Sequence, residues 1–257
     1  MCPSCSDRSA VTAYRCGMDV EELLAEQIAY YRARAPEYDD WWERRDRYYQ
    51  GPEFFEWWRA EIDSVARWFK GLAPLGAVLE IAAGTGNITR LLAPHADSVL
   101  ALDSSTETLE INAVKTAGMS VEYVAADIFA WESDRRFDTV AFGFWLSHVP
   151  EARFEQYWGK VARWLVPGGR AVFVDNRPPD GDWFERRTGN TDAVYDSSRG
   201  TSQRTLRDGH SFDIVKVFWE PDVLEHRLRT LGWQAQVGRT SGAFIHGVAT
   251  LGHSISE

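Results

Sequence analysis

The chain is poor in cysteine, and the few cysteines it has are gathered at one end. Cys2, Cys5 and Cys16 are the three cysteines among 257 residues. The spacing of Cys2 and Cys5 is that of half a zinc site, but this segment contains no histidine that could complete it. We therefore expect no metal, and we expect residues 1–17 to form a flexible tail whose thiols stay reduced.

Long hydrophobic runs and an excess of positive charge are also missing. No apolar run approaches the ~20 residues of a membrane-spanning helix, and the chain does not start with a signal-peptide pattern. We therefore expect a cytoplasmic protein with no membrane partner. The net charge of −10 argues against nucleic acid, which would need a broad basic face. We expect a small-molecule partner, and no feature indicates the oligomeric state.

The remaining sequence divides into a helical cap over residues 18–72 and a core over residues 73–257. In the cap, Asp19 is an expected N-cap, Pro36 interrupts the first helical run, and another helix follows Pro52. In the core, apolar strands alternate with helices. The expected strands are Val78–Ile81, Ser98–Asp103, Val121–Asp127, Phe137–Phe144, Arg170–Asn176, Trp233–Arg239 and Phe244–Leu251. The expected helices are Thr85–Leu92, Ser105–Ala117, Glu151–Leu165 and Pro221–Leu231. This alternation predicts an α/β doubly wound fold with a Rossmann-like sheet.

The alternation is interrupted by an insertion over residues 177–219. Residues 177–200 are polar and rich in Gly, Pro and Asp, so we expect a loop there. The runs on either side of Asp208 and Gly209 predict a β-hairpin. Arg204 and Lys216 lie at similar distances from this turn, and we expect them to approach one another across the two strands. Two cations in an acidic protein would suit a carboxylate or a phosphonate.

Acidic residues stand at three successive strand ends, where ligands of such sheets bind. Glu80 precedes a turn of small residues, Asp103 ends the second strand, and Asp127 follows the third. Glycine in the turn allows close approach of a ligand, and a carboxylate can accept two hydrogen bonds from a ribose diol. Any one of these carboxylates could instead cap a helix or face solvent, but the three in this order predict a nucleotide-like ligand.

These motifs resemble those of class I S-adenosylmethionine-dependent methyltransferases. The resemblance lies in ExAAGTG (Glu80–Gly86), ALD (Ala101–Asp103), AAD (Ala125–Asp127) and LVPGG (Leu165–Gly169), with alanine in place of the first glycine of the family's turn. It implies a sheet of seven strands, the last one antiparallel, and S-adenosylmethionine as the cofactor. The cofactor-binding residues that it implies are Tyr31, Arg34, Glu80, Ala82, Gly84, Thr85, Gly86, Asp103, Ser104, Asp127, Ile128 and Phe144.

Within this set the resemblance implies separate roles. The turn from Ala82 to Gly86 would contact the methionine part, Asp103 the ribose, and Asp127 with Ile128 the adenine. Tyr31 and Arg34 would close the site, the arginine pairing with the cofactor carboxylate. NAD is the rival cofactor, but its GxGxxG fingerprint would need a glycine where this chain has Thr89.

Three further segments are similar to bacterial small-molecule O-methyltransferases of the phosphonate type. They are YYRARAPEYD (Tyr30–Asp39), FWLSHVP (Phe144–Pro150) and RTLRDGHSFDIVKVF (Arg204–Phe218). The resemblance implies that Arg204 and Lys216 hold the anion of the acceptor, together with a tyrosine of the N-terminal helices. Tyr48 and Tyr49 are the candidates for this tyrosine, and Trp145 is a further candidate for the acceptor site.

His148 is the candidate catalytic residue, since histidine titrates near neutrality, although it could instead have a structural role. We expect methyl transfer to a small-molecule acceptor, an O-methylation of an anionic or hydroxyl group in natural product biosynthesis. One alternative is a larger aromatic or polyketide-like acceptor, with the paired tryptophans of the cap as its wall. The other is a protein that binds S-adenosylmethionine without turnover.

Overall fold

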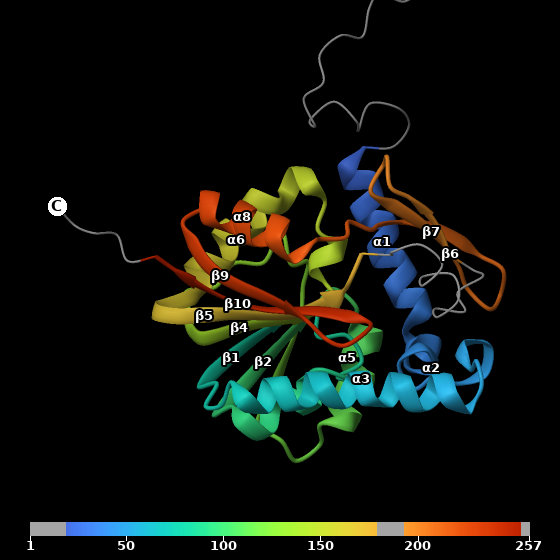
Figure 1. The fold of residues 1–257 in the computed structure, drawn as a ribbon, viewed down its shortest axis with the longest axis horizontal. Coiled ribbons are helices and arrows are strands. Elements are labelled where there is room, and N and C mark those ends of the chain that lie inside the picture. Colours follow the sequence, from blue (N-terminus) through green and yellow to red (C-terminus); the bar gives the residue numbers. More distant parts are fainter. Residues whose placement is uncertain (1–18, 179–192, 253–257) are drawn as a thin grey trace, which may run out of the picture.

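The computed structural model describes residues 19–178 and 193–252. The expected N-terminal tail, with Cys2, Cys5 and Cys16, lies outside these residues, as does part of the expected loop of the insertion. The described residues form a seven-stranded sheet, a three-stranded sheet and helices around them (Figure 1). Within the described part, no helix is long and apolar enough to cross a membrane.

The central sheet has the strand order β3-β2-β1-β4-β5-β10-β9. Its strands are β1 (Ala77–Ile81), β2 (Ser98–Asp103), β3 (Val121–Ala125), β4 (Phe137–Gly143), β5 (Leu165–Asn176), β9 (Trp233–Arg239) and β10 (Phe244–Leu251). The first five strands pair in parallel, whereas β10 is antiparallel to both β5 and β9. The chain order reverses beside β1, so the switch point lies where β1 and β4 end. The predicted Rossmann-like sheet with its antiparallel last strand is confirmed.

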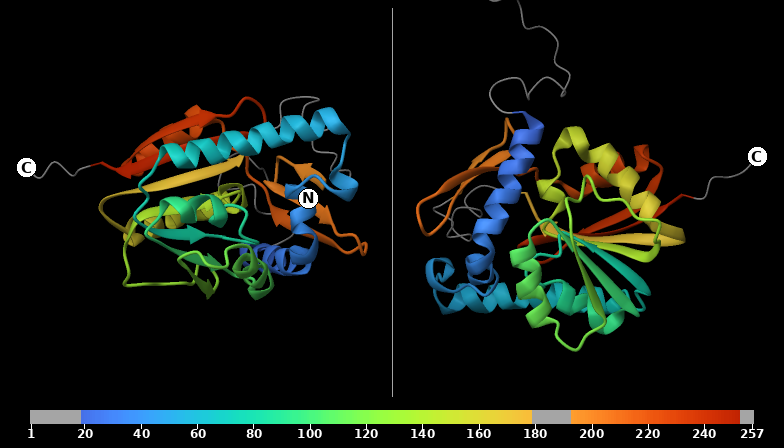
Figure 2. Two further views of the ribbon diagram at one scale, coloured as in Figure 1. Left: turned by 90° about the horizontal axis from the view of Figure 1, so that it is seen from below. Right: turned by 180° about the vertical axis from the view of Figure 1, so that it is seen from behind.

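Both faces of this sheet are covered, as its apolar strands require. The helices are α1 (Val20–Arg34), α2 (Tyr38–Trp42), α3 (Pro52–Gly71), α4 (Thr89–Leu92), α5 (Thr106–Lys115), α6 (Phe154–Trp164) and α8 (Pro221–Thr230). Residues of α3 pack in one apolar cluster with Val78 and Val172, while residues of α6 and α8 pack in another with Leu79 and Phe173. Neighbouring residues of one strand thus serve opposite faces. Figure 2 shows α3 along one side of the sheet.

The second sheet has the order β6-β7-β8, with β6 at Ala193–Asp196, β7 at Thr201–Thr205 and β8 at Ser211–Val215. The predicted hairpin is present as β7 and β8. The prediction that residues 177–200 form only a loop is wrong, because β6 pairs with β7 along its whole length. Helix α1 packs on β8, and the backbone N–H of Val215 donates to Gln27 Oε1 at 3.1 Å.

Several boundaries in the core also differ from the prediction. Strand β5 begins at Leu165 rather than at Arg170, and α6 begins at Phe154 rather than at Glu151. The helix expected from Thr85 begins at Thr89, because Gly84 and Gly86 hold positive φ angles of 52° and 85° that a helix cannot accommodate. Strand β3 ends at Ala125, and the side chain of Asp127 accepts the backbone N–H of Phe129 at 2.8 Å, which starts a turn. The division into a cap and a core stays a prediction. Helix α3, which was expected in the cap, packs against the central sheet.

Helix α3 is fastened to the turn between β9 and β10 by Glu61. This carboxylate is 1% exposed and accepts the backbone N–H of Ala243 at 2.7 Å, together with the hydroxyls of Thr240 and Ser241. We expect Glu61→Ala to lower the free energy of unfolding by about 3 kcal/mol, because buried donors lose their acceptor.

Urea denaturation of Glu61→Ala measures this loss, and Glu56→Ala, on the exposed face of the same helix, is the matched control. Glu56→Ala should stay within about 0.5 kcal/mol of the parent protein. Equal stability of the two variants would contradict the fastening role.

Candidate active site

The turn after β1 has the backbone conformation that close approach to a ligand requires. Ala82, Gly84 and Gly86 have φ angles of 54°, 52° and 85°. A Cβ atom at Gly86 would lie 2.5 Å from Asn112 Oδ1, so this position needs glycine for space as well as for conformation. Ala82 adopts the left-handed region with a side chain, at a cost of about 1 kcal/mol.

The carboxylates of Glu80 and Asp103 are both buried beneath this turn. Asp103 accepts the backbone N–H of Gly84 at 2.8 Å and that of Ser105 at 2.9 Å. Glu80 is 1% exposed, and its Oε2 atom has no hydrogen-bond partner. Burial raises the pKa of Glu80 to about 8, and the nearby Asp103 adds to the effect. A buried polar atom without a partner is costly, and such an atom is a feature of functional sites rather than of ordinary packing.

A first pocket, the cofactor-side pocket, lies above the turn with an empty volume of about 520 Å³. The residues that line it are Tyr31, Tyr38, Ala82, Gly84, Thr85, Asp103, Ser104, Thr108, Ile128, Gly143, Phe144, Trp145 and His148. Eight of the predicted cofactor residues are among them. Glu80 and Gly86 lie behind the lining, and Asp127 is exposed. Arg34 lines a different pocket.

A second pocket, the acceptor-side pocket, adjoins the first and has an empty volume of about 790 Å³. The residues that line it are Tyr31, Arg34, Tyr38, Trp41, Arg44, Trp57, Trp58, Phe144, His148, Asn176, Arg177, Arg204, Ile214, Lys216, Phe218 and Ala243. Five of these are Arg or Lys, and none of the described lining residues is Asp or Glu. The pocket is therefore cationic inside a protein of net charge −10.

Arg204 and Lys216 meet in this pocket, but not in the way predicted. The expectation that they face one another across the hairpin is wrong, because Arg204 pairs with Phe212 and the N–H of Lys216 bonds Gly200. Residues an even number apart on a strand share a face, so both side chains lie on the same face of the sheet, about 13 Å apart along the strands. Both side chains are long enough to reach the acceptor-side pocket.

The other predicted acceptor residues lie elsewhere. Tyr48 is buried and accepts a hydrogen bond from Arg47 at 3.0 Å, outside the lining of the acceptor-side pocket. Tyr49 is 54% exposed and lines a separate surface groove. Trp145 lines the cofactor-side pocket.

Lys216 is held by a short chain of polar groups. Its ammonium donates to Ser147 Oγ at 2.7 Å, and Ser147 Oγ donates to Asp175 Oδ1 at 2.8 Å. The lysine is 4% exposed. Burial lowers the pKa of Lys216 to about 8, Asp175 opposes this shift, and Arg204 and Arg34 add to it. Lys216 therefore loses its charge in a pH range in which a surface lysine keeps it.

Four residues line both pockets and mark where they meet: Tyr31, Tyr38, Phe144 and His148. His148 Nδ1 lies 2.8 Å from the carbonyl oxygen of Val215, and a carbonyl can only accept, so Nδ1 carries the proton. Burial, followed by Lys216, lowers the pKa of His148 well below its usual value, so the ring is neutral. Its Nε2 then accepts the Tyr31 hydroxyl at 2.9 Å.

Known proteins are similar to this chain in sequence and in fold. A model of the methyltransferase domain family matches residues 78–169. The structure of DhpI with S-adenosylhomocysteine (SAH) is 35% identical, with a TM-score of 0.73, and the match covers 91% of this chain and 100% of that chain. DhpI with SAM and HEP is 34% identical with a TM-score of 0.72 and the same coverage. The chain belongs to the class I S-adenosylmethionine-dependent methyltransferases.

Curated relatives of this methyltransferase match over shorter stretches. The ubiquinone/menaquinone biosynthesis C-methyltransferase UbiE of Desulfotalea psychrophila is 35% identical over 108 residues, which are 40% of this chain and 43% of that enzyme. The demethylmenaquinone methyltransferase of Renibacterium salmoninarum is 26% identical over 185 residues, 69% of this chain and 72% of that enzyme. The chain thus spans less than half the length of the UbiE relative.

The cofactor of the methyltransferase is S-adenosylmethionine, and the cofactor-side pocket fits it. The unpartnered Oε2 of Glu80 and the left-handed turn are features of a site that receives a ligand. Asp103 has two lone-pair positions in use by backbone N–H groups, which leaves others for a diol.

The sequence patterns missed several lining residues. Arg44 and Arg177 come from segments without any motif, and Tyr38 lies in the Tyr30–Asp39 segment but is not singled out there. The link of Ser147 to Asp175 joins residues far apart in the chain. Arg44 stands in a run of charged residues in which nothing distinguishes it from its exposed neighbours. Three-dimensional contacts alone single out these residues.

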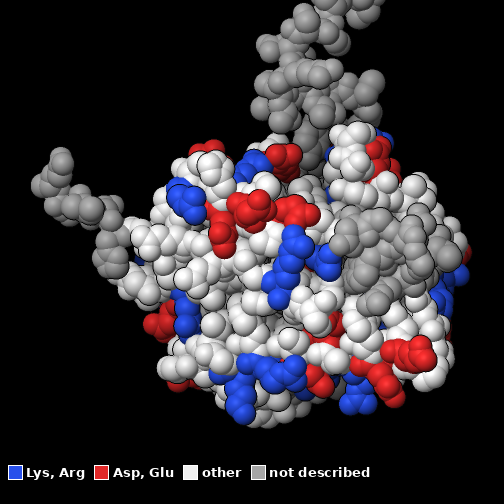
Figure 3. Space-filling model, viewed as in Figure 1, with Lys and Arg blue, Asp and Glu red and all other residues white. Residues whose placement is uncertain are grey.

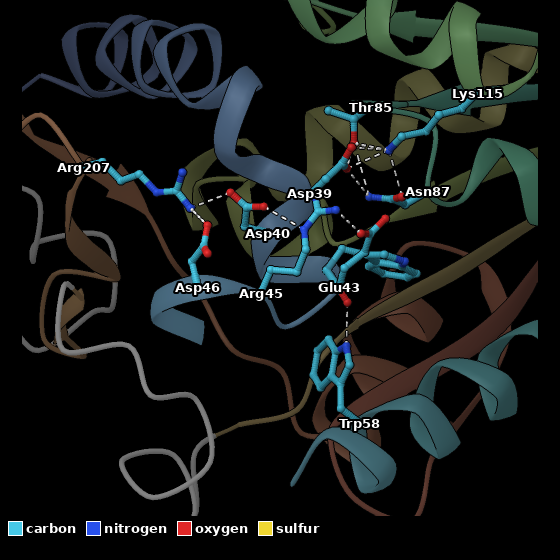
Figure 4. A network of polar contacts seen from close by, with 11 residues as sticks. Asp39, Asp40, Glu43, Arg45, Asp46, Trp58, Thr85, Asn87, Lys115 and Arg207 are labelled. Carbon is cyan, nitrogen blue, oxygen red and sulfur yellow. Dashed lines mark hydrogen bonds and ion pairs between the residues drawn. The ribbon is translucent and has the colours of Figure 1, made fainter. Parts of the chain in front are cut away.

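Helix α2 is joined to the turn by a network around Asp39 (Figure 4). Its carboxylate accepts Thr85 Oγ1 at 2.7 Å, Asn87 Nδ2 at 3.0 Å and Lys115 Nζ at 2.7 Å. Partial burial opposes ionisation of Asp39, but the hydrogen bonds from Lys115 and Thr85 outweigh it and lower its pKa. Asp39 thus holds the turn from outside the pocket.

We expect Asp39→Ala to weaken S-adenosylmethionine binding by about tenfold, because Thr85 and Lys115 lose their common acceptor and the turn loosens. Isothermal calorimetry measures the change. Asp40→Ala is the matched control, since Asp40 pairs with Arg45 and Arg207 instead. An unchanged affinity in Asp39→Ala, or an equal loss in both variants, would refute this role.

Proposed function

We propose that this methyltransferase methylates an oxygen of a small anionic acceptor, a phosphonate or a carboxylate, in natural product biosynthesis. The observation that carries the proposal is the acceptor-side pocket, with Arg34, Arg44, Arg177, Arg204 and Lys216 and no acidic group among its described lining residues. The likeness to DhpI in complex with SAM and HEP supports a small ligand beside the cofactor.

The charge of the pocket favours an anion for energetic reasons. Burying a cation costs several kcal/mol unless an opposite charge accompanies it. The Nε atoms of Arg34 and Arg204 are buried without a hydrogen-bond partner. An anionic acceptor would satisfy these donors, and guanidinium groups bind phosphonate and carboxylate oxygens in a bidentate way. Figure 3 shows acidic and basic side chains mixed on one outer face, in contrast to this lining.

The two pockets define the roles that we propose for the predicted residues. Asp103 and the turn from Ala82 to Gly86 hold the cofactor, with Ser104, Ile128 and Phe144 around it. Bound there, S-adenosylmethionine supplies a methyl group on a positively charged sulfur. Tyr31 and His148 stand at the junction, so the acceptor oxygen and the methyl group would meet beside them.

The protein then acts mainly by alignment and exclusion of water. An acceptor oxygen that is already anionic needs no base, and His148 serves to position Tyr31. For an acceptor hydroxyl, the neutral His148 can take a proton through the Tyr31 oxygen, because Nε2 accepts from that hydroxyl. Arg204 and Lys216 orient the acceptor in both cases. Membership in a family of enzymes argues against the non-catalytic alternative.

Lys216 provides a test through pH. The ammonium is protonated below about pH 8 and attracts an anion, and it loses this charge above that pH. We therefore expect the KM for 2-hydroxyethylphosphonate or another hydroxylated acid that serves as acceptor to rise about fivefold between pH 8 and about pH 9.5. Steady-state methyl transfer over this pH range measures the rise.

Two variants sharpen the result. Lys216→Arg keeps its charge throughout, so its KM should stay level over the same range. Lys216→Met should raise KM at pH 7 by about tenfold or more, with S-adenosylmethionine binding unchanged. A KM that is independent of pH in the parent protein, together with normal kinetics in Lys216→Met, would rule out an anionic acceptor at this position.

A second candidate is methylation of a larger aromatic acceptor, favoured by one observation. Trp41, Trp57 and Trp58 line the acceptor-side pocket, as does Phe218. The matched relatives include a C-methyltransferase of quinone biosynthesis. A transfer assay with hydroxylated phosphonic and carboxylic acids beside phenols and naphthols separates the candidates. Product from the aromatic compounds alone would replace the anionic proposal with this one.

A further inference from the structure

Arg44 is a buried cation that has no role in the proposed methyl transfer to an acceptor with one anionic group. It is 3% exposed, and its Nε and Nη1 atoms are buried without a hydrogen-bond partner. It lines the acceptor-side pocket where that pocket adjoins a shallower surface groove. A buried guanidinium without an ion pair lowers the stability of the folded protein by several kcal/mol. A structural role alone therefore does not explain Arg44.

The carboxylates near Arg44 in the sequence are paired with other residues. Glu43 binds Arg45 at 2.7 Å, and Asp46 binds Arg207 at 2.7 Å (Figure 4). Within residues 19–178 and 193–252, no acidic group forms an ion pair with Arg44. Its environment is aromatic instead, with the guanidinium carbon 3.4 Å from the ring centre of Trp58 and 5.1 Å from that of Trp41.

The backbone at Arg44 is also unusual. Its φ angle is 53°, in the left-handed region, where a side chain other than glycine or asparagine costs about 1 kcal/mol. Stacking on the face of Trp58 fixes the plane of the guanidinium and contributes a favourable cation–π interaction. A strained backbone and a fixed side-chain plane together preorganise the free N–H groups for a ligand.

Arg44 has different neighbouring side chains from those of Lys216 in the hairpin segment. It contacts rings of α2 and α3, while Lys216 is tied to Ser147 and lies 5.0 Å from the ring centre of Phe218. Arg34 lines the same pocket, and burial together with the charge of Arg34 lowers the pKa values of Arg44, Arg204 and Lys216. Within one pocket, Arg44 therefore has different neighbours from Lys216.

We propose that Arg44 binds a second anionic group of the acceptor, so that the acceptor is a small molecule with two separated anionic groups, such as a phosphonate and a carboxylate. This inference rests on the proposed function and deepens it. The group to be methylated lies near Tyr31 and His148, held by Arg204 and Lys216, and the distal anion receives the N–H groups of Arg44. The aromatic rings around Arg44 contact the carbon skeleton between them.

Calorimetry on the full-length protein saturated with S-adenosylhomocysteine tests this assignment. The probes are methylphosphonate, with one anionic group, and phosphonoacetate, 3-phosphonopropionate and 4-phosphonobutyrate, with two groups at increasing separation. In the parent protein, the best of the three bifunctional probes should bind at least about tenfold more tightly than methylphosphonate.

Arg44→Met keeps the apolar stem against Trp58 and removes the charge. It should abolish the advantage of the bifunctional probe and change methylphosphonate binding less than about twofold. Lys216→Met is the contrasting variant, because it should weaken both kinds of probe. Arg44→Lys retains a charge without the planar fork, and should keep part of the advantage. Unchanged S-adenosylhomocysteine affinity confirms that each variant is folded at its cofactor-side pocket.

The possible outcomes distinguish failure of the role of Arg44 from failure of the proposed function. Failure of all four probes to bind the parent protein would overturn the anionic acceptor itself. Equal affinity of the parent for methylphosphonate and every bifunctional probe would overturn the role of Arg44 alone and leave the anionic acceptor in place. Loss of S-adenosylhomocysteine binding in both Arg44→Met and Arg44→Lys would assign Arg44 to the cofactor and likewise overturn the inference.

Discussion

Burial of positive charge without carboxylates beside it is the constraint on which the acceptor side of this enzyme depends. Arg34, Arg44 and Arg204 each have a buried donor atom without a partner, and aromatic rings surround two of these guanidinium groups. Ring faces compensate part of the lost hydration, while they leave the N–H groups available. A carboxylate in place of these rings would stabilise the folded protein more. It would, however, occupy the N–H groups that an anionic ligand would otherwise bind.

The cofactor side obeys a different constraint, which is backbone conformation. The turn after β1 is bent by three left-handed residues and held from below by Asp103. Asp39 then ties the turn to the cap through Thr85 and Lys115. Helix α2 therefore supports the turn that lines the cofactor-side pocket. The two pockets meet at side chains that are far apart in the sequence, with Tyr31 from α1 and His148 from the segment after β4.

The elements that could be predicted from the sequence are those that one local pattern determines. Apolar strands with Glu80 and Asp103 near their ends identify the sheet and its switch point. Strands that are apolar throughout are typical of a buried parallel sheet, and few other folds contain them. The start of α4 was misplaced, since helical periodicity does not register the φ angles of the preceding glycines. The sequence does not predict strand β6, because its four residues, Ala193–Asp196, stand within a stretch that is otherwise polar and rich in turn-forming residues.

Side-chain placement in the cap was beyond prediction for a similar reason. Short turns at Ala35–Glu37 and Asp46–Tyr48 change the direction of the chain twice, so the faces of α2 and of the following segment cannot be continued from α1. Tyr48 and Tyr49 were therefore assigned to the acceptor, whereas Tyr38 and Arg44 line its pocket. Arg204 and Lys216 are predicted because Asp208 and Gly209 mark the hairpin and because the family resemblance assigns both cations to the acceptor.

The antiparallel sheet β6-β7-β8 gives the molecule a second property. It contributes Arg204, Ile214 and, just past its end, Lys216 to the acceptor-side pocket, but none of the described residues that line the cofactor-side pocket. The small sheet thus contributes to one pocket and not to the other, although residues of other elements line both. A substitution in its three strands can therefore reshape the acceptor-side pocket without replacing any described residue that lines the cofactor-side pocket.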